Sequence, residues 1–166
     1  MKKLFTLLLF CYALLSAGCS HGERLATEVE GSWRSSPISL AAPADSIPLT
    51  DLLFEPTFTF IKDDGQYGGQ LTLFSKATAT TNAGSYPIHL VANGSWTAYN
   101  DDTIIFLIDS EGISITPAPS TAPPPAAVTS AVALLLKTLP GIDNINISDS
   151  RMNAEISDHD VVLIKK

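Results

Sequence analysis

Apolar and polar residues alternate with a period of two along most of the chain, a pattern typical of β-strands that bury one face. The clearest case is TFTFIKDDGQYGGQLTLF, in which Phe58 and Phe60 alternate with threonines and Leu71 and Leu73 alternate with polar residues. Asp64-Gly65 lies between the two halves and predicts a hairpin turn, since both residue types tolerate positive φ angles. We therefore expect two antiparallel strands with these apolar side chains on the inner face.

A second hairpin is predicted from YPIHLVANGSWTAY, which turns at residues 100–102 into TIIFLID. Alternation places one set of residues of the first half on a shared face, and Phe106 of the second half faces the same side. The residues of the shared face are Ile88, Leu90, Ala92, Gly94, Trp96 and Ala98. The stretch DSEG, residues 109–112, predicts a further turn into GISIT.

The C-terminal region predicts one more pair of strands, NINISDSRMNAEIS and DVVLIKK, which meet at Asp158-His159. Ile145 and Ile147 occupy odd positions, whereas Met152 and Ile156 occupy even positions, so the inward side must switch between them. We expect a β-bulge or kink at residues 148–150, because an extra residue reverses the alternation.

With a first strand at about residues 31–40, these signals amount to about eight strands. Short turns join neighbouring strands, which predicts an up-and-down antiparallel meander. Such a meander removes its exposed edges most simply by closing into a barrel. The predicted fold is therefore mainly β, with residues 31–166 forming a single barrel domain.

One segment breaks the strand pattern. Residues 119–141 form a Pro-rich loop followed by a predicted helix at residues 126–139, which Pro140-Gly141 terminates before the last two strands. The helix has no charged residue from Val128 to Leu136, so it should be buried against something. Two interpretations stay open: the helix packs as core over the barrel, or it is a mobile lid or a partner-docking surface.

The N-terminus has the features of a processing segment. Residues 1–18 contain a basic start and an apolar run too short to span a membrane, and they are expected to be a signal peptide. LLSAGC resembles the lipobox, which implies lipidation of Cys19 and a membrane anchor of palmitate-type acyl chains. Ser20 after the cysteine implies sorting to the outer membrane, on either its periplasmic or its surface side. Residues 19–30 are expected to be the lipidated cysteine and a flexible tether.

Charge and cysteine content narrow the function classes. The net charge of −7 and the lack of a basic stripe make nucleic acid an improbable partner. Two cysteines occur, Cys11 in the signal peptide and Cys19, so the mature domain has no disulfide, thiolate nucleophile or cysteine metal site. Because an acidic domain is not expected to lie flat on anionic lipid, the expected membrane contact is the N-terminal lipid.

The triplet Gly-Ser-Trp occurs twice and contains both tryptophans of the chain. Gly allows another backbone to approach closely, and a Trp two residues later can plug one end of a small barrel while its indole N–H finds a carbonyl. We therefore interpret Gly31, Trp33, Gly94 and Trp96 as a barrel-closing motif and not as a duplicated catalytic motif.

These motifs resemble the lipocalin-like lipoproteins of Bacteroidota, in which a G-x-W strand follows the tether, an F-x-F strand precedes D-G-x-Y, and a second G-x-W precedes an acidic turn. The matching residues are Gly31, Trp33, Phe58, Phe60, Asp64, Gly65, Tyr67, Gly94, Trp96, Asp102, Thr103, Ile104 and residues 161–164, the start of the closing strand VVLIKK. The resemblance implies a lipocalin-like barrel on the outer membrane. Asp45-Ser46-Ile47 also resembles the O-glycosylation pattern of this phylum, which makes Ser46 a candidate site.

Candidate catalytic chemistry is sparse. His21, His89 and His159 show no metal-ligand spacing, and neither H-E-x-x-H nor G-x-S-x-G occurs. The pairs Asp63-Asp64 and Asp101-Asp102 fall in predicted turns, where Asp is expected for its backbone geometry. We expect no enzyme activity, no cofactor and no metal site.

The expected function is binding of a small apolar or amphiphilic ligand, and the alternative is a structural role in an envelope complex that docks a partner protein through the 126–139 helix. If the barrel is hollow, strand alternation selects the candidate ligand-binding side chains; if it is filled, the same side chains form its core. These residues are Phe58, Phe60, Leu71, Leu73, Leu90, Trp96 and Phe106.

Overall fold

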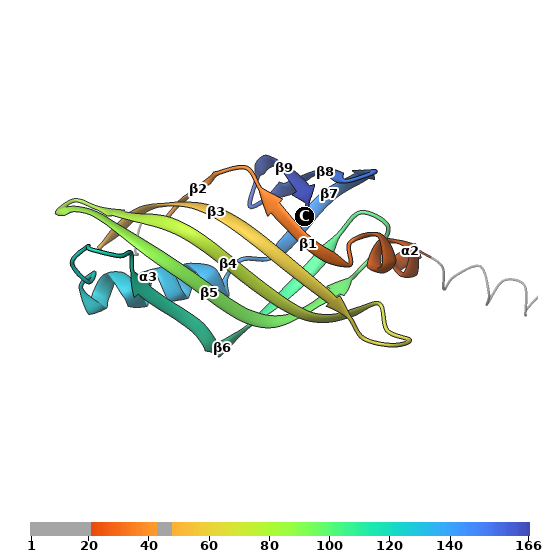
Figure 1. Ribbon diagram of the computed structural model, residues 1–166, viewed down its shortest axis with the longest axis horizontal. Coiled ribbons are helices and arrows are strands. Elements are labelled where there is room, and N and C mark those ends of the chain that lie inside the picture. The colour runs from red at the N-terminus through yellow and green to blue at the C-terminus, as the bar shows by residue number, and fades with distance from the viewer. Residues whose placement is uncertain (1–20, 43–47) are drawn as a thin grey trace, which may run out of the picture.

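The computed structural model describes residues 21–42 and 48–166 (Figure 1). In this part of the chain, nine strands form one antiparallel sheet in the order β1-β9-β8-β7-β6-β5-β4-β3-β2, and β1 also pairs with β3. The elements are α2 (His21–Glu28), β1 (Gly31–Ser35), β2 (Ile38–Ala41), β3 (Leu49–Lys62), β4 (Gly68–Thr81), β5 (Gly84–Ala98), β6 (Ile104–Pro117), α3 (Ala126–Lys137), β7 (Gly141–Ser148), β8 (Arg151–Ile156) and β9 (His159–Lys165).

The sheet closes into a ring through β1. Trp33 of β1 lies opposite Phe58 of β3 on one side and opposite Lys165 of β9 on the other. Neighbouring strands from β3 to β9 follow one another along the chain, apart from the crossing through α3 between β6 and β7. The prediction of a mainly β, up-and-down meander with ring closure is confirmed.

The ring is complete at one end only. Strands β3 to β6 contain 14, 14, 15 and 14 residues, whereas β1 and β7 to β9 contain 5, 8, 6 and 7. β6 pairs with β7 only through Ile104 and Ile105, and the rest of β6 runs beside α3 (Figure 1). The long strands therefore extend past the closed ring and form a curved sheet whose inner side α3 covers.

Alternation builds the core as the sequence predicts. On β5, Ile88, Leu90, Ala92, Trp96 and Ala98 are at most 5% exposed, and the residues between them are partly or fully exposed. The turns at Asp64-Gly65 and at residues 100–102 also lie where they were predicted, between β3 and β4 and between β5 and β6.

Pro56 lies inside β3, a position that a central strand normally excludes because proline lacks the N–H of the ladder. Its partner on the β4 side is Ser75. On the other side β1 pairs up to Thr57 and β2 begins its pairing at Phe54, so Pro56 faces the gap between these two short strands. The break between β1 and β2 therefore accommodates a residue that cannot donate a hydrogen bond.

Three details of the C-terminal half differ from the prediction. α3 ends at Lys137 and precedes three strands, not two, because residues 141–148 and 151–156 are separate strands. Residues 148–150 are not a bulge: Ser148 lies opposite Arg151, and Asp149 has a φ of 55° in the hairpin turn between them. A tight turn changes the inward parity as a bulge would, so alternation alone could not separate the two.

The predicted turn at residues 109–112 is wrong. β6 continues through it, and the register moves from Gly94 opposite Ile108 to Ala92 opposite Ile113. Residues 109–112 are therefore an extended bulge opposite Asn93, whose Nδ2 donates to the Gly112 carbonyl over 3.5 Å. Acidic and small residues suit a solvent-exposed bulge as well as they suit a turn.

The prediction of a flexible tether is wrong for most of residues 19–30. α2 spans His21–Glu28, and Leu25, Ala26 and Val29 are 1%, 0% and 0% exposed. Leu25 and Ala26 lie on the buried side of the helix and Val29 directly follows it, and burying all three compensates for the polar composition of the segment. Neither helix of the described residues is long and apolar enough to cross a bilayer. The predicted signal peptide, the predicted lipidation site Cys19 and the candidate glycosylation site Ser46 lie outside the described residues.

Candidate functional site

The closed end of the barrel is sealed by α2. Trp33 donates its indole N–H to the Val29 carbonyl over 2.7 Å, a buried hydrogen bond that joins β1 to the segment after α2. The Lys165 ammonium lies 5.2 Å from the centre of the Trp33 ring and 3.4 Å from the Glu28 carbonyl. A cation at this position also interacts favourably with the C-terminal end of the helix.

Four aromatic side chains fill the axis beside this seal. The ring of Phe60 is 5.4 Å from Trp96 in an edge-to-face contact and 6.2 Å from Phe106. Phe58 stands 6.1 Å from Phe60 and 5.6 Å from Phe106. These separations are those of aromatic rings in direct contact, so the cluster itself occupies the space around these rings.

All seven predicted ligand-binding side chains point inward and are at most 7% exposed; they are Phe58, Phe60, Leu71, Leu73, Leu90, Trp96 and Phe106. The structure brings the four aromatic ones together in the cluster just described. Because these four contact one another, they act as core at this end of the barrel. A ligand would therefore need another place to bind.

The glycines of the two Gly-Ser-Trp triplets lie where another strand approaches closely or where the backbone bends. A Cβ atom on Gly94 would lie 2.1 Å from the Leu107 carbonyl oxygen, so only glycine permits this approach of β6. Gly31 has a φ of 114°, at the bend into β1. Trp96 donates its indole N–H to the Ile61 carbonyl over 3.3 Å, as Trp33 does to Val29.

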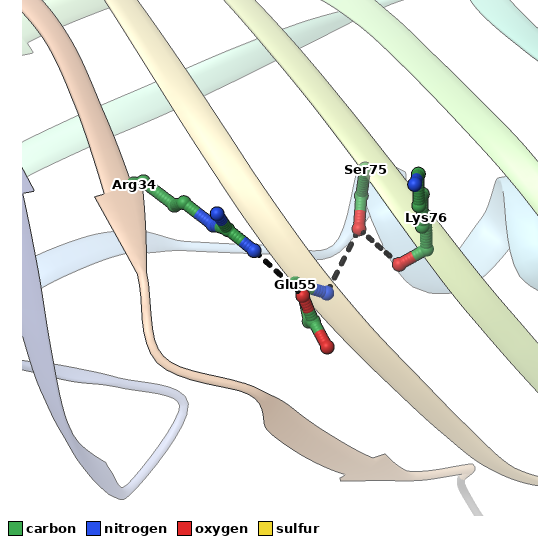
Figure 2. Close-up of polar contacts among 4 residues, drawn as sticks. All are labelled: Arg34, Glu55, Ser75 and Lys76. Carbon is green, nitrogen blue, oxygen red and sulfur yellow. Dashed lines mark hydrogen bonds and ion pairs between the residues drawn. The ribbon is translucent and has the colours of Figure 1, made fainter. Parts of the chain in front are cut away.

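A polar chain of contacts crosses the outer wall near the break between β1 and β2 (Figure 2). Arg34 donates to the Glu55 carboxylate over 3.2 Å, and the Glu55 backbone N–H donates to the Ser75 hydroxyl over 2.9 Å. The Ser75 hydroxyl donates in turn to the Lys76 carbonyl over 2.7 Å. Both hydrogen bonds of this buried serine go to the backbone, so its hydroxyl joins β3 to β4.

A hollow of about 230 Å³ lies in the half of the molecule where the long strands extend past the closed ring. It opens between three elements with no ladder pairing between them: the edge strand β2, the end of α3, and the turn from β8 to β9. The lining residues are Leu40, Ala41, Leu135, Thr138, Leu139, Ser157 and His159. We call this hollow the seam, because in the part of the chain that the structure describes these three elements have no strand pairing with one another.

The seam combines an apolar floor with a polar rim. Leu40 and Leu139 are each 4% exposed, and Leu135 is partly buried against the same core. At the rim, the Nδ1 atom of His159 lies 2.7 Å from the Ser157 carbonyl, which leaves the other ring nitrogen to interact with a bound molecule. An apolar tail could lie on the leucines while a polar group meets the imidazole.

His89 and His159 do not converge on a site. His89 is half-buried on the outer face of β5, 6.4 Å from the ring of Phe74, and His159 lies at the seam. Within residues 21–42 and 48–166, no three His, Cys, Asp or Glu side chains are grouped so that they could hold a metal ion.

Sequence reasoning missed both α2 and the seam. Ser20-x-x-Glu23 followed by RLATEV is a helix-start signature with an apolar stripe, and it could have revealed α2. No comparable signal marks the seam, because β2, α3 and the β8–β9 turn meet only in the folded chain. No known protein-family model matches the chain, and no curated protein is similar to it in sequence.

Proposed function

We propose that the protein is an outer-membrane lipoprotein of lipocalin-like type that binds a small apolar or amphiphilic ligand without catalysis. The ring-closed meander is the fold that the resemblance to lipocalin-like lipoproteins implies. Acylation of Cys19, the lipobox cysteine, is the proposed anchor.

The seam carries this proposal. It is an apolar hollow with an imidazole at its rim, and it lies away from the aromatic cluster that fills the closed end. A volume of about 230 Å³ is below the 300 Å³ or so at which typical ligand pockets begin, so the ligand is small or only partly enclosed.

Native mass spectrometry of residues 20–166 before and after organic extraction tests the proposal. We expect a discrete small mass to be lost on extraction, and dodecanoate added afterwards to bind again. Ala41→Trp places an indole at the seam and should prevent rebinding. Ala83→Trp, at an exposed alanine of the β4–β5 turn, is the matched control and should rebind normally. Equal rebinding by both variants would exclude the seam as the site.

A second candidate is docking of a partner protein through α3. From Val128 to Leu136 α3 has no charged residue, yet of its side chains only Val128, Val132 and Leu136 are buried. Part of its apolar surface is therefore exposed, including Leu134, which is 57% exposed. Leu134→Lys should abolish association of the protein with itself or with an envelope partner, measured by analytical ultracentrifugation and cross-linking. Ser130→Lys on the same exposed side is a control for charge alone, and equal effects of both would argue against a leucine-centred contact.

A further inference from the structure

We propose that the end of the barrel that carries α2 rests on the surface of a zwitterionic bilayer, with Tyr67 and Tyr99 among the lipid headgroups. The proposal rests on the anchoring of Cys19 that forms part of the proposed function. It adds a defined protein surface to the lipid anchor, and it fixes which end of the barrel faces away from the membrane.

The first argument is the length of the connection. Cys19 precedes His21, the first residue of α2, by two positions. Two fully extended residues span at most about 7 Å. α2 is held to the barrel by buried Leu25 and Val29, and by Lys62, whose ammonium donates to the Thr27 hydroxyl over 3.2 Å. An acylated Cys19 would therefore hold this end of the barrel close to the membrane.

The second argument is the surface of that end. The Tyr67 carbonyl accepts a hydrogen bond from Ala98 over 2.7 Å, and a Cβ atom on Gly22 of α2 would lie 3.0 Å from the Ala98 carbonyl oxygen. The β3–β4 turn, the β5–β6 turn and α2 therefore meet at one rim, as Figure 1 shows. Tyr67 and Tyr99 are 40% and 72% exposed there.

Aliphatic side chains extend the same rim. Ile61, at the end of β3, is 51% exposed, and Ile105, at the start of β6, is 45% exposed. Tyrosine places an apolar ring and a polar hydroxyl at a membrane interface, where both find suitable surroundings. Two tyrosines and two isoleucines around the anchor point thus form a surface suited to the interface of a bilayer.

The charges at this end select the kind of lipid. The two turns also contain Asp63, Asp64, Asp101 and Asp102, and the whole chain has a net charge of −7. Anionic headgroups would repel these carboxylates. Zwitterionic headgroups would not, so the proposal commits to a surface without net charge.

The test measures how close a tryptophan at either end of the barrel comes to the lipid. Tyr99→Trp adds one beside α2, and Asn82→Trp adds one in the β4–β5 turn at the opposite end, while Trp33 and Trp96 are 0% and 1% exposed and give a constant background. The full chain is produced in cells, its mass is checked for acyl groups, and it is reconstituted into phosphatidylcholine vesicles with or without brominated acyl chains. In a second preparation, the unacylated mature chain is coupled through Cys19 to a maleimide lipid in the same vesicles.

We expect bromine to quench the added emission of Tyr99→Trp in both preparations and to leave that of Asn82→Trp unchanged. The quenching should weaken in vesicles rich in phosphatidylglycerol. As a control, coupling through Asn82→Cys in a Cys19→Ser background should remove the quenching of Tyr99→Trp. The proposed orientation would be refuted if bromine quenched both variants, or if it quenched Asn82→Trp alone. It would also be refuted if neither variant were quenched in the protein coupled through Cys19. A mass without acyl groups, together with quenching in the coupled protein, would refute the lipoprotein assignment and leave the orientation standing.

Discussion

The two tryptophans have the same sequence setting but different hydrogen bonds. The Trp33 indole is 2.7 Å from the Val29 carbonyl and lies beneath a lysine ammonium, whereas the Trp96 indole is 3.3 Å from the Ile61 carbonyl. The shorter, fully buried bond should contribute more to stability, since a buried carbonyl that loses its donor must be desolvated without compensation.

Trp33→Phe is therefore expected to lower the free energy of unfolding by about 1–3 kcal/mol, the usual cost of one unsatisfied buried polar group. Trp96→Phe removes the same atoms from a longer, part-buried bond and should cost less. Urea unfolding followed by circular dichroism measures both. A larger loss for Trp96→Phe would show that ring packing, and not the indole N–H, governs stability at these positions.

Ser35, in contrast to the two tryptophans, buries a polar group without a hydrogen bond among the residues that the structure describes. Its residue is 5% exposed, and within the described part of the chain its hydroxyl oxygen has no hydrogen-bond partner. Ser35→Ala should stabilise the fold by up to about 1 kcal/mol, because it removes a buried polar group that gains nothing from folding. Thermal unfolding of Ser35→Ala is compared with that of Ser32→Ala. The second variant loses a hydrogen bond of 2.9 Å between the Ser32 and Thr59 hydroxyls and should not be stabilised in the same way. A clear destabilisation by Ser35→Ala would mean that its hydroxyl is bonded in solution.

At the scale of elements, α3 combines a buried stripe with an exposed apolar face. Leu136→Ala should lower the free energy of unfolding by about 2–5 kcal/mol, the range for a leucine truncated in a core, because Leu136 is 1% exposed. Leu134→Ala removes the same atoms from a position that is 57% exposed, and should change stability by less than about 0.5 kcal/mol. Chemical unfolding of the two variants in parallel tests this, and similar losses would place Leu134 in a packed contact.

Sequence alternation predicted the elements better than their connections. Parity placed all seven inward side chains correctly, because a strand with one buried face leaves each residue only two directions. Parity could not separate the hairpin at residues 148–150 from a bulge, nor the bulge at residues 109–112 from a turn. The seam could not be predicted at all, since its leucines come from β2, α3 and the segment directly after α3, and its histidine from β9.

Ring closure joins the first strand of the domain, β1, to the last, β9. Trp96 lies on β5, which pairs with its neighbours in the chain, β4 and β6. Trp33 lies on β1, which pairs with β9 from the far end of the chain as well as with β3, and its ring contacts the Lys165 ammonium. Contacts between distant parts of a chain form slowly, because their loop-closure entropy must be overcome first.

Refolding in the millisecond-to-second range is therefore expected. The fluorescence of Trp33, isolated by Trp96→Phe, should reach its native value no earlier than that of Trp96, isolated by Trp33→Phe. Stopped-flow dilution from urea measures both signals. An earlier Trp33 signal would show that β1 and β9 associate before the long hairpins form.

The pairing of β1 with β9 also brings the last residue of the chain beside the first strand. The Lys166 backbone N–H donates to the Ser32 carbonyl over 2.9 Å, next to the start of β1. A short glycine-rich linker could therefore join residue 166 to residue 30, with new termini opened in the exposed β4–β5 turn at Asn82-Ala83. Such a circular permutant would keep every strand pairing of the ring while moving both termini to the other end of the barrel.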